Sequence, residues 1–264
     1  MPCVSYLANG FCHEASGKDK RFGMSELRFF NPLPTSATVT MTVYYGDREP
    51  AELPALTIAG HQDPLLVFPH ASYGAGDYRK FFANCGPWGM RFVSDTPVLA
   101  DHIFSAGIQG PPGNVKYAGG VCDMLIQPRL SRLWYFADLI RIIHKDIAQT
   151  ASGPFPYHEF EWYHILNPNE KRATVRLVFY RWDGKEECRE FAVPGQRVLM
   201  FDNYDWYKQT IGGGARFVSD LPVLVESERM IHGLEGLDEW GAHIHCPRPG
   251  TPAPLQWNEE GAEA

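Results

Sequence analysis

The stretch Arg-Phe-Val-Ser-Asp-Thr-Pro-Val-Leu at residues 91–99 occurs a second time, as Arg-Phe-Val-Ser-Asp-Leu-Pro-Val-Leu at residues 216–224. Upstream of each copy, an Asn-Pro pair precedes an alternating run, at residues 31–45 in the first half and 167–180 in the second. A unit of roughly 100 residues that occurs twice is a duplicated domain, because solenoid repeats have periods of about 20–50 residues. The sequence therefore predicts two related domains, and we look for function where the copies differ.

Both copies carry the patterns of β-strands. Residues 37–45 alternate apolar and hydroxyl side chains with a period of two, and residues 173–180 alternate in a similar way, which is typical of strands with one buried face. The pair Asp183-Gly184 between two such runs strongly predicts a two-residue hairpin turn. Many short runs of this kind, among 25 glycines and 21 prolines, predict an all-β fold with a sandwich or barrel in each copy and little helix. Residues 139–147 fit a short helix or a strand.

The repeat also sets the domain boundaries. We expect a first β-sandwich at residues 1–110, a linker at 111–131, a second β-sandwich at 132–246 and an irregular tail at 247–264. The first copy has an insertion at residues 71–88 that is too aromatic for a solvated linker, so we expect it to pack over something.

Composition limits the function classes. The net charge of −7, with acidic residues spread along the chain, provides no basic face for phosphates, so we expect no nucleic-acid partner. No apolar run approaches the roughly 20 residues that span a bilayer, and the N-terminus lacks a basic segment, so we expect a cytoplasmic protein without membrane insertion. The six cysteines form no Cys-x-x-Cys pair and do not recur in the two copies, which argues against a disulfide framework.

The chain resembles the sensory rhodopsin transducer family. Residues 44–50, Tyr-Tyr-Gly-Asp-Arg-Glu-Pro, are close to the family's Tyr-Tyr-Ser-Asp-Arg-Glu-Pro, and residues 134–138, 165–167 and both Ser-Asp-x-Pro stretches agree in order and spacing. The resemblance implies β-sandwiches of jelly-roll type that bind a small molecule, with sugars or sugar derivatives as the usual suggestion. This chain departs from the family by its duplication, since the simplest members carry one copy and assemble as oligomers. A homo-oligomer is therefore one of the expected assemblies.

His102 lies where the family has a histidine in its last strand, and Ser227 holds the equivalent place in the second copy. If this histidine matters, the two copies are unequal. Asp101 points to the opposite face of the strand, which excludes a simple Asp–His dyad. A hydrogen-bonded strand histidine and a ligand-binding histidine both remain open for this position.

The second copy has two further candidate regions. Alternation places Glu159, Glu161 and Tyr163 on one strand face. A carboxylate beside a tyrosine can bind sugar hydroxyls, and it can serve as an acid or base if burial raises its pKa. The other alternative is a solvated strand face. Residues 201–207, Phe-Asp-Asn-Tyr-Asp-Trp-Tyr, combine carboxylates, an amide and rings that suit sugar faces, or they plug the end of the sandwich. The candidate ligand-binding residues are His102, Trp88, Glu161, Tyr163, Asp202, Asn203, Tyr204 and Trp206.

A metal and a cofactor are not expected. His243 and His245 share a strand face near Cys246 and His232, but a third ligand with recognisable spacing is missing. The leading hypothesis is a protein that binds a small polar ligand, a carbohydrate above all, in a pocket lined by both copies. The alternatives are a signalling adaptor that binds another protein and an enzyme that acts on a sugar or related hydroxylated substrate. The candidate catalytic residues of that enzyme are Glu161, Glu159 and His102.

Overall fold

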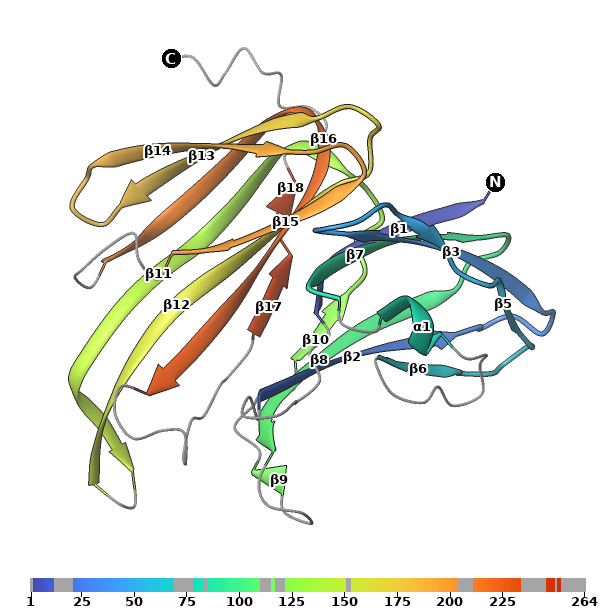
Figure 1. The fold of residues 1–264 in the computed structure, drawn as a ribbon, viewed down its shortest axis with the longest axis horizontal. Coiled ribbons are helices and arrows are strands. Elements are labelled where there is room, and N and C mark those ends of the chain that lie inside the picture. Colours follow the sequence, from blue (N-terminus) through green and yellow to red (C-terminus); the bar gives the residue numbers. More distant parts are fainter. Residues whose placement is uncertain are drawn as a thin grey trace.

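The fold is all-β, as the sequence predicts (Figure 1). The computed structural model describes residues 2–11, 21–68, 78–82, 85–109, 115–116, 122–150, 153–203, 211–233, 246–249 and 251–252. The helix α1 (Arg79–Phe82) has four residues. Among the described residues, no helix has the length and apolar character needed to cross a membrane.

Two sheets packed face to face form the first sandwich. Its strands are β1 (Cys3–Phe11), β2 (Arg21–Phe30), β3 (Ala37–Tyr45), β4 (Ala51–Glu52), β5 (Leu56–Ile58), β6 (Leu65–Phe68), β7 (Pro87–Ser94), β8 (Leu99–Gln109), β9 (Val115–Lys116) and β10 (Cys122–Leu125). One sheet has the order β1-β7-β3-β4 with β5 also paired to β3, and the other has the order β10-β8-β2-β6 with β9 paired to β8. The period of two along β3 buries Val39, Met41 and Val43 between the sheets, as expected for a strand with one buried face.

Two very long strands hold the second sandwich together. Its strands are β11 (Ser131–Thr150), β12 (Gly153–Asn167), β13 (Ala173–Arg181), β14 (Glu186–Val193), β15 (Arg197–Asp202), β16 (Ile211–Gly233), β17 (Cys246–Pro249) and β18 (Thr251–Pro252). Their order is β14-β13-β16-β11-β12-β15. The first part of β16 pairs with β13 and β11, and its second part pairs with β12, so β16 passes from one layer to the other.

The long strands correct one expectation and decide another. The sequence pattern predicts separate strands at residues 215–218 and 223–230, but these are parts of the single strand β16. Residues 219–222 stay extended between them, which the fixed φ of Pro222 permits. Residues 139–147, which fit either a helix or a strand, lie within β11.

The two sandwiches have the same strand order. In the first, β1-β7-β3 form one layer and β8-β2-β6 the other; in the second, β11-β16-β13 and β16-β12-β15 take these places. The register agrees as well, since His102 lies opposite Leu27 and Ser227 lies opposite Tyr163. The common ancestry of the halves stays a prediction from the sequence, which this repeated order supports.

The two Asn-Pro motifs make the same hydrogen bonds. Asn31 and Asn167 are both fully buried, and each donates from Nδ2 to three backbone carbonyl groups at 2.7–3.3 Å. The acceptors belong to Thr35, Ile58 and Ala59 in the first sandwich and to Lys171, Val193 and Pro194 in the second. Each asparagine thereby ties the end of one strand to the end of another.

Replacing either asparagine should have a similar effect. We expect Asn31→Ala and Asn167→Ala each to lower the free energy of unfolding by about 2–4 kcal/mol, because buried carbonyl groups lose their donor. Urea unfolding followed by circular dichroism measures the change, with the exposed Gln62→Ala as the control. A large loss for one asparagine and none for the other would contradict an equivalent role.

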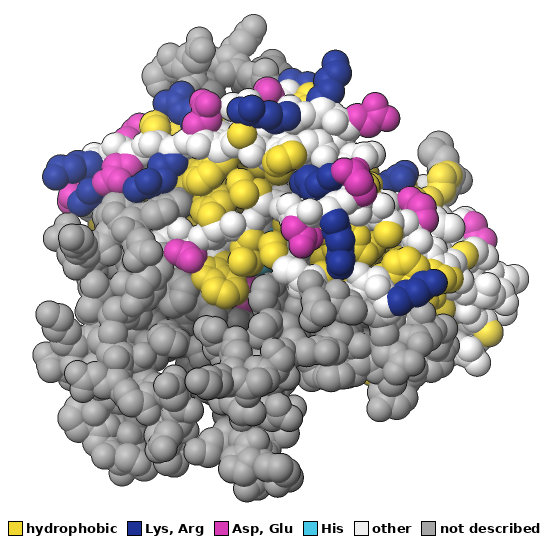
Figure 2. Space-filling model, viewed as in Figure 1, with side chains coloured by type: hydrophobic (Ala, Val, Ile, Leu, Met, Phe, Trp, Pro, Cys, Tyr) yellow, Lys and Arg dark blue, Asp and Glu magenta, His cyan; other side chains and the backbone are white. Residues whose placement is uncertain are grey.

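The second sandwich packs against the first through the outer face of its β12–β15 layer. In Figure 1, β12 and β15 lie alongside β1 and β7. Ala8 and Tyr44 of the first sandwich belong to the hydrophobic cluster of the second. Gly89 permits the close approach, since a Cβ atom there would lie 2.7 Å from the carbonyl oxygen of Leu7 and 3.0 Å from Cγ2 of Val198. Figure 2 shows hydrophobic side chains gathered over β15 and beside this junction.

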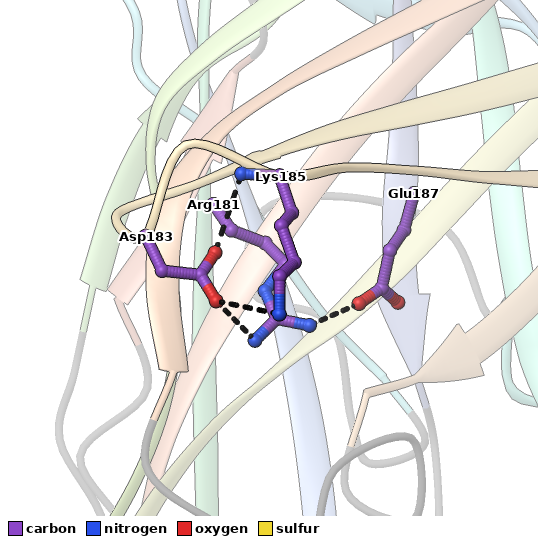
Figure 3. A network of polar contacts seen from close by, with 4 residues as sticks. All are labelled: Arg181, Asp183, Lys185 and Glu187. Atoms are coloured by element: carbon purple, nitrogen blue, oxygen red, sulfur yellow. Dashed lines mark hydrogen bonds and ion pairs between the residues drawn. The ribbon is translucent and has the colours of Figure 1, made fainter.

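The hairpin between β13 and β14 carries a network of charges that compensate one another (Figure 3). Arg181 donates to Asp183 and to Glu187, and the backbone N–H of Lys185 donates to Asp183 at 3.3 Å. Gly184 has a φ of 80°, as the predicted tight turn requires. Two cations and two anions are thus paired at the surface, so the network itself does not mark this tip as a ligand site.

Candidate functional site

Five polar side chains lie buried where the two sandwiches meet. They are Asn9, His102, His164, Glu226 and Glu228, which we call the interface polar cluster; each is at most 1% exposed. Polar side chains are rarely buried so completely unless they are paired, and charged ones almost never. This cluster is therefore the first place to look for function.

The pairing of β12 with β16 brings three members onto one face. His164 lies directly opposite Glu226, so both side chains project from the same side of the sheet. Glu228 is two residues farther along β16 and shares that side. Because Glu226 contacts β1, this side is the one that faces the first sandwich.

Glu226 completes the hydrogen bonding of a bulge in β1. The register between β1 and β7 shifts between Leu7 and Gly10, which takes the N–H groups of Ala8 and Asn9 out of the ladder. Both donate instead to Glu226 Oε2, at 2.7 and 2.8 Å. A side chain of the second sandwich thus satisfies two buried donors of the first.

Burial disfavours the ionised form of Glu226. Burial raises the pKa of its carboxyl to about 8, although the N–H groups of Ala8 and Asn9 oppose the rise. Since Oε2 accepts both N–H bonds, we place the proton of the neutral form on Oε1. This oxygen is buried and has no hydrogen-bond partner among the described residues.

His102 projects from β8 into the first sandwich. Its ring meets the edge of Trp88, with centroids 6.2 Å apart and planes at 72°. Burial, with a smaller effect of nearby His164, lowers the pKa of His102 to about 3, so the imidazole is neutral at pH 7. Within the described part of the chain, neither ring nitrogen has a hydrogen-bond partner.

His164 is the second neutral imidazole of the cluster. Burial lowers its pKa to about 3. Its Nε2 lies 3.6 Å from Glu228 Oε2, which is longer than a hydrogen bond, and the contact is one between a neutral ring and a carboxyl group. Both ring nitrogens are buried without a hydrogen-bond partner in the residues that the structure describes.

Trp88 supports His102 from inside the first sandwich. Its ring is fully buried and packs edge-on against Phe82, with centroids 4.9 Å apart. The ring also lies over Gly10, where a Cβ atom would come within 2.2 Å of it. Trp88, predicted as a ligand-binding residue, therefore occupies a packing position beneath the cluster.

A second polar group lies on the other face of β12. The hydroxyl of Tyr163 donates to Glu161 Oε2, and the N–H of Glu161 donates to Asn203 Oδ1 at 2.9 Å. The N–H of Asn203 returns a bond to the carbonyl oxygen of Glu161 at 3.0 Å. Glu161 and Tyr163 share a face as the alternation predicts, but the alternative of a solvated face is wrong, because Glu161 is only 1% exposed and Tyr163 is stacked on Phe201.

The predicted site residues thus fall into separate groups. Glu161, Tyr163 and Asn203 are brought together in the second sandwich, and Trp88 meets His102 in the first. Asp202 lies opposite Trp162 at the end of β15 and is partly buried. Four other predicted residues lie outside the residues that the structure describes: Tyr204, Trp206, His243 and His245. Glu159 lies in β12, but its side chain is not among those described.

The sequence patterns do not single out four of the five cluster members. Asn9, His164, Glu226 and Glu228 stand in strands where alternation alone assigns them to a face without saying what covers it. Asp101, the equivalent of Glu226 in the first copy, is exposed, so comparison of the copies suggests a solvated position. The available clue was that Glu226 and Glu228 follow an apolar run with a spacing of two, which puts both carboxyls on one face.

The described residues do not form a ready metal site. Among them, no group of three or more His, Cys, Asp and Glu side chains has an arrangement that could hold a metal ion. The interface polar cluster offers hydrogen bonding by an amide, two neutral imidazoles and carboxyl groups.

Comparison with known proteins leaves the function open. No protein-family model and no curated protein matches the chain. Among solved structures, Thermotoga maritima 1070 is similar over 47% of this chain and 91% of that one, at 13% identity and a TM-score of 0.33. A Bacteroides uniformis β-glucuronidase is similar over 93% of this chain at 8% identity and a TM-score of 0.20, and the chain spans 30% of its length. At these TM-scores, neither similarity assigns a fold or a function to this chain.

Proposed function

We propose that this chain binds a small polar ligand, a carbohydrate or sugar derivative, at the interface polar cluster, and that it does so in the cytoplasm as a protein of the sensory rhodopsin transducer type. One observation carries the proposal. Both amide atoms of Asn9, the ring nitrogens of His102 and His164, and Glu226 Oε1 are buried without hydrogen-bond partners among the described residues.

Such a concentration of unpaired groups is costly. Each buried polar group without a partner costs about 1–3 kcal/mol, and native proteins keep few of them. A ligand with several hydroxyl groups would offset this cost, because each hydroxyl both donates and accepts. Since the unpaired groups come from both sandwiches, the bound ligand would contact both halves of the chain.

The surroundings also suit a sugar. Trp162 lies two residues before His164 and projects from the same face of β12. An indole ring offers an apolar face to the C–H groups of a sugar and a polar N–H at its edge. The cluster thus combines hydrogen-bonding groups with a neighbouring aromatic side chain, the usual composition of a small-molecule site.

A thermal-shift screen tests the proposal. We expect neutral monosaccharides or disaccharides to raise the melting temperature, because a ligand that binds only the native state stabilises it. Asn9→Ala and His164→Ala should abolish most of this ligand-induced shift. The matched control is Glu49→Gln, since Glu49 is an exposed carboxylate whose ion pair with Arg197 lies between the same two sandwiches.

The ligand-induced shift is compared with each variant's own unliganded melting temperature, so a loss of stability does not mimic a loss of binding. A shift that persists undiminished in both cluster variants would place the ligand elsewhere. A complete screen without any shift would contradict the proposed function, and co-purification of a protein partner would then favour the adaptor alternative.

An enzyme that acts on a sugar is the second candidate. The arrangement that favours it is the buried Glu226 carboxyl, whose pKa burial raises to about 8, opposite His164, an imidazole that burial keeps unprotonated. A proton donor beside a proton acceptor is the arrangement that acid–base catalysis requires. Appearance of a product in NMR spectra of the bound sugars would support the enzyme, and unchanged sugars would support binding alone.

A further inference from the structure

Apart from the carboxyl groups of Glu226 and Glu228, the interface polar cluster offers a ligand an amide and two imidazoles. Asn9 contributes an amide, and His102 and His164 contribute imidazoles that are buried away from water. None of the five cluster residues is a lysine or an arginine. The cluster therefore combines donors and acceptors without a permanent positive charge.

We infer that the interface polar cluster binds uncharged, hydroxyl-bearing ligands and rejects those that carry an anionic group such as a carboxylate or a phosphate. This inference rests on the proposed function and specifies its ligand class. Recognition of an anionic group in a buried site requires a cationic or multiply donating partner, since burial of an unpaired charge is far more costly than burial of a hydroxyl.

Glu226 strengthens the discrimination. It projects into the cluster with Oε1 unpaired within the described residues, and its only hydrogen bonds there are those from Ala8 and Asn9. In its neutral form this carboxyl donates a hydrogen bond to a ligand hydroxyl. An anion placed beside it would meet like charge whenever the carboxyl ionised.

The protonation states of the neighbours agree with this picture. Among the described residues, the titratable groups beside Glu226 are His164, directly opposite it on β12, and Glu228, two residues farther along β16. His102 on β8 lies near His164. Both imidazoles have a pKa of about 3, so neither gains a proton at neutral pH to hold an anion. Burial thus keeps both imidazoles of the cluster neutral rather than cationic.

Matched sugar pairs test the inference on the full chain. We would measure binding of D-glucose against D-glucuronate, D-galactose against D-galacturonate, and myo-inositol against myo-inositol 1-phosphate at pH 6.5, by saturation-transfer NMR and calorimetry. The expected result is that at least one neutral member binds and that its anionic counterpart binds at least tenfold more weakly. Equal or tighter binding of the anionic members would overturn the inference while leaving the proposed function intact. Absence of binding by every compound would overturn both.

The pH dependence identifies the responsible group. We expect the affinity for the neutral sugar to fall about tenfold between pH 7 and pH 9 in the wild type, as Glu226, with its pKa of about 8, loses its proton. Glu226→Gln should remove this fall, because glutamine retains a donor and does not ionise, whereas Glu49→Gln should retain it. A fall that persists in Glu226→Gln would show that another group governs binding and would overturn the assignment.

Discussion

Replacement of Glu226 by alanine is expected to lower the free energy of unfolding by about 2–6 kcal/mol. The substitution leaves the N–H groups of Ala8 and Asn9 buried without an acceptor, and each such donor costs about 1–3 kcal/mol. For a chain of this size the melting temperature should fall by about 2–4 °C for each kcal/mol lost. Urea unfolding and thermal melting followed by circular dichroism measure the two effects.

Two variants separate the loss of the hydrogen-bond acceptor from the loss of a carboxyl group. Glu226→Gln keeps an oxygen that accepts both N–H bonds and should cost less than half as much as the alanine variant. Glu49→Gln removes an exposed carboxylate from the junction and should change stability little, because exposed ion pairs contribute little. Equal losses for the alanine and glutamine variants would contradict the role of Glu226 as the acceptor for the β1 bulge.

The second large effect is a stability maximum near pH 6.5. The pKa values of His102 and His164 are about 3 in the folded protein and 6.5 when unperturbed, so the folded state binds fewer protons between these values. Stability from both imidazoles therefore rises as the pH rises from about 3 to about 6.5. Protonation of these buried rings in acid should destabilise the protein by several kcal/mol.

Glu226 acts in the opposite direction. Its pKa is raised from 4.5 to about 8 in the folded protein, which then binds more protons than the unfolded chain between these values. Its contribution is complete below about pH 4.5 and is lost as the pH rises towards 8. Up to about pH 6.5, the stability gained from the two histidines as the pH rises outweighs the stability lost from Glu226. Above about pH 6.5, only the loss from Glu226 continues.

Unfolding free energies measured from pH 4 to pH 9 test this profile. The double variant His102→Asn and His164→Asn should flatten the acid side, and Glu226→Gln should flatten the alkaline side. Because each variant alters one limb, a general loss of stability cannot imitate the result. An acid limb of unchanged slope in the double variant would show that other groups control the acid side.

Local patterns in the sequence predict much of the fold. The period of two along residues 37–45 and 173–180 specifies strands with one buried face, and the structure contains them as β3 and β13. The correspondence of His102 with Ser227 also follows from the repeated motif, and the strand registers agree with it. These properties depend on near neighbours in the chain, so the sequence order alone carries the information.

The length of β16 shows where local patterns fail. The Ser-Asp-Leu-Pro segment resembles the turn that separates β7 from β8 in the first copy, yet in the second copy it is extended within one strand. Pairing with different partners on its two halves maintains the extended form. Such partners are distant in sequence, and alternation does not identify them.

By itself, the sequence determined the strands at residues 37–45 and 173–180, which side chains share a strand face, and that one motif recurs in both halves. It did not identify β9 and β10 in the expected linker or β17 and β18 in the expected irregular tail, because these short strands depend on pairing with β8, β16 and β11. Only the tertiary structure decided which outer face is buried: the layer carrying His164 and Glu226 is covered by the first sandwich, whereas the equivalent Asp101 stays exposed. Glu226 and the Ala8 N–H that it accepts from are 218 positions apart in the chain. Alternation reports the direction of a side chain, but burial depends on what packs against it, and that packing also sets the pKa values on which the proposed site depends.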